Sequence, residues 1–230
     1  MAMGSAQRSV HTLEQLGFLR RDEHTRRWVL TSKTLSLGYP YLAGHQVLEQ
    51  ATPHLVDLNQ ACGESVSLSE PDRVEMVYIA RFPSHKRFLI HMPVGRRLPM
   101  YCTASGRAYL SVLPRKEVEE LLDRSDLRSF TPHTVTDRER ILELVAAARE
   151  CGYAWASEEC YRGDLVVGAP ILGANGRPIA SVSVAAPASR WTLAELRTRV
   201  GPLLIQTARA ASSTVSALGA AAADAAHSEN

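Results

Sequence analysis

The sequence has few cysteines and no long apolar segment. Its four cysteines lie apart without a Cys-x-x-Cys pair, at Cys62, Cys102, Cys151 and Cys160. Neither a disulfide framework nor a zinc knuckle is therefore indicated. No apolar run approaches the roughly 20 residues that span a bilayer, and residues 1–10 lack the apolar segment of a secretory signal. These absences predict a cytoplasmic protein without membrane contact, and no cofactor or metal is expected.

The chain also lacks a strong overall charge. Among its 230 residues, 26 basic and 24 acidic side chains leave a formal net charge of +2. The distribution is uneven, because residues 1–39 carry a net +3 and the remaining residues a net −1. A short basic segment on a nearly neutral body is typical of a nucleic-acid contact at one end. A solvated basic surface explains the same charge equally well.

Residues 1–38 have the pattern of one helix followed by two short strands around a polar turn. Ser5 is a candidate N-cap of the helix, and Gly17 is expected to end it. The apolar residues at helical spacing are Val10, Leu13 and Leu16. This order predicts the second half of a winged helix-turn-helix. The helix that would brace a recognition helix is missing, since the sequence starts too late to supply it.

The rest of the chain predicts a linker helix and a larger α+β domain. The helical pattern over 39–60 contains Pro53, which is expected to kink or divide it. Alternating or apolar segments then predict strands at 65–69, 74–82, 87–92, 153–158, 165–172 and 178–185. Because several of these form hairpins, the sheet is expected to be mostly antiparallel.

Helices are predicted between these strands and at the end of the chain. One is expected over about 106–113. Thr136 and Thr192 are each followed three residues later by a glutamate, which predicts two further helix starts. The first of these is expected to end at Gly152, and the second to bend or restart at Gly201-Pro202.

Several segments resemble the IclR family of bacterial transcription regulators, in the order in which that family has them. For the wing and the start of the linker they are 16–21, 28–31 and 35–38. For the effector-binding domain they are 63–68, 77–81, 95–99, 102–108, 168–171, Gly176 and 180–184. The segment 98–107 is most similar to the branch that senses aromatic acids such as protocatechuate or 4-hydroxybenzoate.

The resemblance implies a domain organisation and a set of partners. Residues 1–38 would be a partial winged helix-turn-helix, 39–60 the linker helix and 61–220 a GAF-like effector-binding domain, with a disordered tail at 221–230. The implied partners are double-stranded operator DNA, a small carboxylate effector and a second copy of the chain, in a homodimer or tetramer. The implied role is transcription regulation of a catabolic operon.

The segment Thr-Ala-Ser-Gly-Arg at 103–107 is the candidate binding site for the carboxylate. Small residues let an anion approach the backbone, and a helix N-terminus presents N–H groups to it. An ordinary capped helix start explains the same residues. By resemblance, the residues expected to contact the effector are Ala104, Ser105, Gly106 and Ser183, with Met100 and Val166 as candidates for an apolar wall.

Ser183 belongs to a predicted strand in which alternate residues share a face. Ser181 and Ala185 are therefore expected on the same face as Ser183. A second serine of the family pattern is Ala185 here, which removes one hydrogen-bonding group and implies a different ligand shape. A serine tolerated inside a sheet is the simpler alternative for Ser183, as plain core packing is for Met100 and Val166.

Candidate DNA contacts lie on the first helix and on the predicted wing. They are Arg8, Ser9, His11, Arg26 and Arg27. The two wing arginines would contact phosphates, which fix the register of a protein on DNA rather than its sequence preference. A solvated face is the alternative. A second alternative for the whole chain is a ligand-sensing oligomeric module without autonomous DNA binding.

An enzyme and a metal sensor are the remaining possibilities. Cys102 or Ser105 near a helix N-terminus could act as a nucleophile, with His91 or His133 as base. No motif of a known nucleophile, zinc protease or phosphate loop accompanies them, so no enzyme is predicted. A metal site of His85, His91 and a cysteine lacks ligand spacing.

Overall fold

Two compact units divide the chain, Met1–His45 and Gln46–Asn230. The computed structural model describes residues 3–85 and 92–228, and side chains from 4 to 217 within those ranges. The boundary between the units falls inside the predicted linker helix. Each unit is described separately below.

The first unit has one helix followed by a hairpin, as expected. Its elements are α1 (Met3–Gln15), β1 (Leu19–Arg21), β2 (Trp28–Leu30), a 3-10 turn (Ser32–Thr34) and α2 (Leu35–Ala43). Gly17 ends α1 with a φ of +76°, in the left-handed region that favours glycine. The proposed N-cap was wrong, because Ser5 lies inside α1 and its carbonyl accepts a hydrogen bond from Ser9 Oγ at 3.1 Å.

The predicted linker helix is two helices in the structure. α2 ends at Ala43, and α3 (Gln46–Cys62) begins after Gly44 and His45. The Gly44 N–H donates to Pro40 O at 3.0 Å, closing the last turn of α2. Pro53 does not divide α3, which continues through it. The break therefore falls at a glycine, the poorest helix former after proline.

The second unit is built on a six-stranded antiparallel sheet, which confirms the α+β expectation. The strand order is β5-β4-β3-β8-β7-β6. The strands are β3 (Ser65–Asp72), β4 (Glu75–Phe82), β5 (Arg97–Pro99), β6 (Ala154–Ser157), β7 (Asp164–Leu172) and β8 (Pro178–Pro187). β5 was not predicted, and the strand predicted at 87–92 lies outside the described residues except for Met92.

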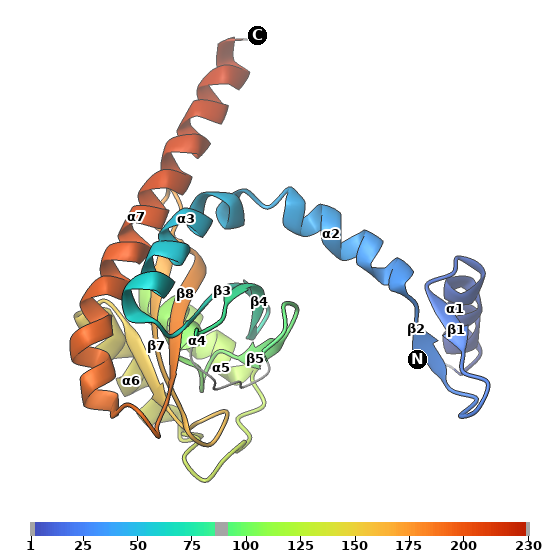
Figure 1. Ribbon diagram of the computed structural model, residues 1–230, viewed down its shortest axis with the longest axis horizontal. Coiled ribbons are helices and arrows are strands. Elements are labelled where there is room, and N and C mark those ends of the chain that lie inside the picture. The colour runs from blue at the N-terminus through green and yellow to red at the C-terminus, as the bar shows by residue number, and fades with distance from the viewer. Residues whose placement is uncertain (1–2, 86–91, 229–230) are drawn as a thin grey trace. The chain divides into compact units, whose positions relative to one another are not determined.

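Helices lie against both faces of this sheet (Figure 1). They are α3, α4 (Ala104–Val112), α5 (Arg115–Asp123), α6 (Arg138–Cys151) and α7 (Leu193–Ser228). α3 and α7 pack on each other and on one side of the sheet, whereas α4 packs on β7 and β8 with α6 behind it. Among the described helices, none has the length and apolarity needed to cross a membrane.

The helix starts differ in part from those expected. α6 begins one residue later than the predicted box, since Asp137 Oδ1, rather than Thr136, accepts from Arg140 N at 2.8 Å. The capping box of α7 is confirmed, because Glu195 Oε2 accepts from Thr192 N at 2.8 Å. α7 neither ends nor restarts at Gly201-Pro202, and it continues to Ser228 through most of the expected tail.

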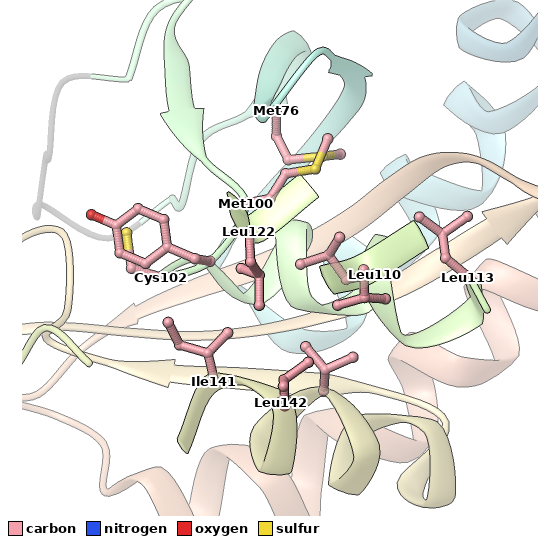
Figure 2. Packing of buried hydrophobic residues seen from close by; sticks show 11 residues of the cluster. Met76, Met100, Cys102, Leu110, Leu113, Leu122, Ile141 and Leu142 are labelled. Carbon is pink, nitrogen blue, oxygen red and sulfur yellow. The ribbon is translucent and has the colours of Figure 1, made fainter. Parts of the chain in front are cut away.

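An apolar cluster joins α4, α5 and α6 to the segment before α4 (Figure 2). Met100 lies in this cluster beside Met76, with 2% of its surface exposed. The other members labelled in Figure 2 are Cys102, Leu110, Leu113, Leu122, Ile141 and Leu142. Burial of each of these side chains stabilises the fold by about 1.5–3 kcal/mol relative to leaving it exposed. The cluster therefore holds α4 in place.

Candidate ligand-binding site

The start of α4 is a capped helix N-terminus. Thr103 Oγ1 accepts from Gly106 N at 3.1 Å and donates to Pro99 O at 2.8 Å. Ala104 and Ser105 occupy the first turn, where backbone N–H groups have no partner within the helix. The Thr103 side chain confirms the capped-start alternative and satisfies one of these N–H groups. The anion site stays a prediction.

Two glycines hold α4 tightly against its surroundings. A Cβ on Gly106 would lie 2.2 Å from Met100 Cα, and a Cβ on Gly168 would lie 2.8 Å from the carbonyl carbon and oxygen of Ala104. Both contacts are with backbone, which cannot move aside as a side chain can. Gly106 thus lets α4 approach the preceding loop, and Gly168 lets it approach β7.

A cavity of about 720 Å³, part of it open to solvent, lies beside the N-terminus of α4. Its walls come from β3, β4, β7, β8, the segment before α4 and the loop between β6 and β7. Three of the six predicted effector contacts line it, namely Ala104, Val166 and Ser183. Ala185, expected on the face of Ser183, lines it too.

The other three predicted residues are not part of the cavity lining. Gly106 packs on Met100, and Met100 belongs to the apolar cluster. Ser105 is 1% exposed, and its Oγ has no hydrogen-bond partner in the described part of the chain. The Tyr78 phenol lies close enough to the Ser105 hydroxyl to interact with it. Burial raises the pKa of Tyr78 to about 12, and Ser105 opposes that rise.

Two acidic residues near the cavity form close ion pairs that the sequence analysis missed. Glu64 is fully buried and accepts from Arg190 Nη2 at 2.8 Å and from Trp191 Nε1 at 3.0 Å. Glu159 forms a bidentate pair with Arg107, with N···O distances of 2.5 and 2.7 Å. Both carboxylates line the cavity, and both are neutralised by their partners.

A third acid, Asp164, stands at the start of β7 and also lines the cavity. Burial raises the pKa of Asp164 to about 7, and the positive charge of Arg81 opposes this rise. Arg81 lines the same cavity and its own pKa is lowered by burial. The wall thus holds three acids and two arginines, where the sequence analysis expected mainly backbone and serine.

The two cysteines of the cavity lie beside each other, and Cys160 lacks the lowered pKa of an activated nucleophile. Cys102 Sγ lies 3.5 Å from Cys160 Sγ, and both residues line the cavity. The hydrogen bond with Cys102 and burial raise the pKa of the Cys160 thiol, opposite to the shift that activates a thiolate. Among the described residues, no three His, Cys, Asp or Glu side chains form a metal site. His91 lies outside them.

All five candidate DNA contacts are exposed in the first unit. Arg8, Ser9 and His11 lie on α1, and Arg26 and Arg27 lie at the turn before β2. Arg26 has a φ of 58°, in the left-handed region, and its N–H donates to Asp22 O at 2.9 Å, which closes the hairpin turn. Exposure leaves both interpretations, DNA contact and solvated face, compatible with the structure.

Comparison with known proteins identifies the class. The family model described as bacterial transcriptional regulator IclR C-terminal matches residues 39–213. The Pca regulon regulatory protein of Pseudomonas putida is 30% identical over 206 residues, covering 89% of this chain and 70% of that protein. The p-hydroxybenzoate hydroxylase transcriptional activator of Acinetobacter baylyi is 32% identical over 209 residues, covering 89% and 76%.

Solved structures agree. A transcriptional regulator of Rhodococcus sp. RHA1 superposes with a TM-score of 0.79 at 32% identity, covering 94% of this chain and 85% of that one. An inducer-binding domain from Acinetobacter, solved with 3-hydroxybenzoic acid, gives 0.65 at 31% identity, covering 70% and 95%. The chain belongs to the IclR family. Its relatives are transcription regulators rather than enzymes, so Cys102 and Ser105 have no catalytic role to explain.

Proposed function

We propose that the chain is a DNA-binding transcription regulator that responds to a small carboxylate effector, an aromatic acid, and controls a catabolic operon. The observation that carries this proposal is the cavity beside the N-terminus of α4, with Ser183 in its wall. The names of two similar proteins, which refer to the Pca regulon and to p-hydroxybenzoate hydroxylase, support an aromatic acid.

In this proposal the effector carboxylate lies at the first turn of α4. The partial positive charge of the helix N-terminus attracts an anion, and the side chain of Ala104 is too small to block its approach. The Ser183 hydroxyl donates to the carboxylate from the sheet, and Val166 contacts the apolar part. Ser105, Gly106 and Met100 would support this site without lining the cavity.

Removing one hydroxyl from the cavity wall tests the site. We expect Ser183→Ala to weaken binding of the best acid about five- to tenfold, which corresponds to one hydrogen bond. Ser181→Ala is the matched control, because Ser181 is buried two residues away on β8 but is not part of the cavity lining. Binding is measured by isothermal titration after a thermal-shift screen of aromatic and short aliphatic acids. Equal effects of the two variants would contradict this placement.

The first unit supplies the proposed DNA contact and, with the linker, the contact between copies. We propose residues 1–38 as the DNA-binding part, 39–60 as the linker and 61–220 as the effector-binding domain. Apolar side chains of α2 are exposed and would be covered by a second copy; they are Leu35, Leu37, Tyr39 and Tyr41. The effector would then act by binding one arrangement of the homo-oligomer more tightly than another.

Salt-dependent binding to duplex DNA tests the DNA contact. Each phosphate contact contributes about 0.9 to the slope of log K against log salt, so Arg26→Gln with Arg27→Gln is expected to lower that slope by roughly 2. Fluorescence anisotropy with a labelled DNA duplex, taken from the region upstream of the regulated operon, measures this slope. If the chain shows no DNA binding at low salt while it still binds acid, the alternative of a sensing module without autonomous DNA binding is the better description. The observation that favours this alternative is that no described residue of the first unit is buried.

A further inference from the structure

Two cysteines of the chain lie in contact in the wall of the cavity. The Sγ atoms of Cys102 and Cys160 are 3.5 Å apart, although the two residues are separated by 58 positions in the sequence. The Cys160 Sγ also lies 3.5 Å from the carbonyl oxygen of Cys102. Cys102 belongs to the segment before α4, and Cys160 belongs to the loop between β6 and β7. The contact therefore joins two separate segments of the cavity wall.

A buried arginine holds both cysteines in place through the residues that precede them. Arg107 is 1% exposed. Its Nε donates to the carbonyl oxygen of Tyr101 at 2.8 Å, and its Nη2 donates to the carboxylate of Glu159 at 2.7 Å. Tyr101 and Glu159 each come directly before one cysteine of the pair. Because hydrogen bonds of a charged group are strong in a protein interior, the fold itself keeps the two thiols together.

The two sulfurs need only a small movement to form a covalent bond. An S–S bond is about 2.05 Å long, so the sulfurs would have to approach each other by roughly 1.5 Å. A partial rotation of each side chain about its Cα–Cβ bond covers such a distance. The backbone of Cys160 lies in a loop, and loops adjust more readily than strands or helices.

An oxidant in solution has a path to this pair. Cys160 is partly exposed, and both cysteines line a cavity that is in part open to solvent. Cysteines that only fill a core behave as small apolar groups and are shielded from such reagents. Simple packing of two thiols is nevertheless the alternative that an experiment has to exclude.

We propose that Cys102 and Cys160 form an oxidation site, at which a peroxide converts the two thiols to an intramolecular disulfide. The disulfide joins the segment before α4 to the loop between β6 and β7. The shape of the cavity then depends on the oxidation state of the chain. This site does not require the proposed acid effector, so it stands or fails separately from the proposed function.

The reaction takes two steps and consumes one peroxide molecule. In the first step, one thiol loses its proton and its sulfur attacks a peroxide oxygen. An S–O bond forms and the O–O bond breaks, which gives a sulfenic acid, and the proton goes to the leaving oxygen. In the second step, the other thiol attacks the sulfenic sulfur, so that the S–S bond forms, the S–O bond breaks and water leaves. The thiol pair loses two electrons, and the peroxide gains them.

The two steps are expected to differ in rate. The hydrogen bond with Cys102 and burial raise the pKa of Cys160, and the attacking species is a thiolate rather than a thiol. Cys160 is therefore a weak nucleophile toward a peroxide in solution. Once a sulfenic acid has formed, the second thiol is already beside it and reacts as an intramolecular nucleophile. The disulfide should therefore accumulate without the sulfenic acid.

Thiol counting on the full chain tests the inference. The variant Cys62→Ser with Cys151→Ser keeps the proposed pair and removes the two other cysteines. After treatment with hydrogen peroxide, the chain is unfolded in iodoacetamide and its intact mass is measured. We expect the loss of both alkylated thiols without a covalent dimer, and dithiothreitol should restore them.

Peptide mapping identifies the bond. Trypsin is expected to release Cys102 in the peptide 98–107 and Cys160 in the peptide 150–162. The second peptide also contains Cys151, so the variant without Cys151 makes the assignment unambiguous. In that background, Cys102→Ser and Cys160→Ser should each lack the linked peptides, and the remaining thiol should be trapped by dimedone as a sulfenic acid. If a serine variant does not fold, the alanine variant takes its place.

Thermal unfolding provides a second measurement. The bond closes a loop that spans 58 sequence positions. A crosslink of this kind constrains the unfolded chain and is expected to raise the thermal midpoint by roughly 5–15 °C. The oxidised double variant should therefore unfold at a higher temperature than the reduced one, and dithiothreitol should reverse the difference.

The possible outcomes are distinct. Linked peptides 98–107 and 150–162 that disappear in Cys160→Ser support the oxidation site. Two thiols that stay alkylable, under conditions in which the same peroxide oxidises free glutathione, overturn it in favour of simple packing. Oxidation to sulfinic or sulfonic acid without linked peptides also overturns it, as does a disulfide that joins two chains.

Discussion

The two units of the chain differ in how they bury their apolar side chains. In the second unit, a sheet with helices on both faces covers a continuous core, and large side chains such as Leu55, Leu68 and Ile171 are fully buried. In the first unit, no described residue is buried. Eight of its large apolar side chains are exposed, namely Leu13, Leu16, Trp28, Leu30, Leu35, Leu37, Tyr39 and Tyr41.

This difference predicts that the first unit gains stability from a partner and that the second does not need one. A domain of the size of the second unit obtains its stability from its own core. A unit of 45 residues with an open apolar surface gains stability when another surface covers it. Substitutions should therefore act on unfolding in the second unit and on assembly or DNA binding in the first. The following predictions test that division.

The largest expected effect comes from the buried ion pair of the second unit. Arg107→Leu leaves Glu159 charged and buried without its main partner, and removing one member of such a pair costs about 3–5 kcal/mol of unfolding free energy. Urea denaturation followed by circular dichroism measures this loss. Arg20→Leu is the control, since Arg20 is exposed on β1 and a surface change is expected within about 0.5 kcal/mol. A loss below about 1 kcal/mol for Arg107→Leu would contradict the structural role of the pair.

The next effect depends on pH. The pKa of Asp164 is raised from its ordinary 3.8 to about 7, mainly by burial. The folded chain therefore holds a proton that the unfolded chain releases, so this contribution to stability is complete below pH 4 and is lost as the pH rises through 7. Asp164→Asn removes it, and the stability of the unmodified chain should fall relative to the variant between pH 5 and 8 by about 2–4 kcal/mol. Parallel stability curves for the two proteins across that range would refute the raised pKa.

Replacement of a glycine by alanine is expected to change stability by a smaller amount, and in opposite directions in the two units. Gly168→Ala places a Cβ 2.8 Å from the backbone of Ala104, which must shift α4 away from the sheet at a cost of about 1–3 kcal/mol. Gly38→Ala in α2 meets no atom within 4 Å, and alanine favours a helix over glycine by about 0.5–1 kcal/mol. Thermal unfolding should show a lower midpoint for the first variant and an unchanged or higher one for the second. A lower midpoint for both would weaken the contrast between the units.

The smallest effect on unfolding is expected on the exposed face of α2. Leu37→Ser with Tyr39→Ser removes two apolar side chains that are 66% and 74% exposed. The second unit should unfold with the same midpoint within about 0.5 kcal/mol, whereas the mass in solution should fall toward that of one chain. Light scattering after size-exclusion chromatography measures the mass. An unchanged oligomer would move the proposed contact between copies away from α2.

Local patterns predicted much of the fold and part of the site. The alternating or apolar segments predicted β3, β4, β7 and β8. The alternation in β8 also predicted that Ser183 and Ala185 share a face, and both line the cavity. β5 was missed because it has three residues and depends on pairing with β4. The split between α2 and α3 was missed because the helical pattern continues on both sides of Gly44.

Partners distant in sequence explain the rest. Glu64 pairs with Arg190 and Glu159 with Arg107, 126 and 52 positions apart, so no local motif marks these acids. Asp164 carries only the signal of an acid that begins an apolar strand. The alternation of side chains along β7 assigns Val166 to one face of the sheet. It does not reveal that Asp164, at the start of the same strand, lines a cavity.

The contacts of Gly106 and Gly168 have a consequence for mutational tolerance. In a library that samples every residue at each position, both should strongly favour glycine, whether selection is for ligand response or for folded protein alone. Ser183 should instead tolerate alanine when folding is selected and lose it when response is selected. Intolerance to substitution around the start of α4 and the cavity therefore has two separate origins. Comparing the two selections separates residues that are needed for ligand response from glycines that are needed for close packing of the backbone.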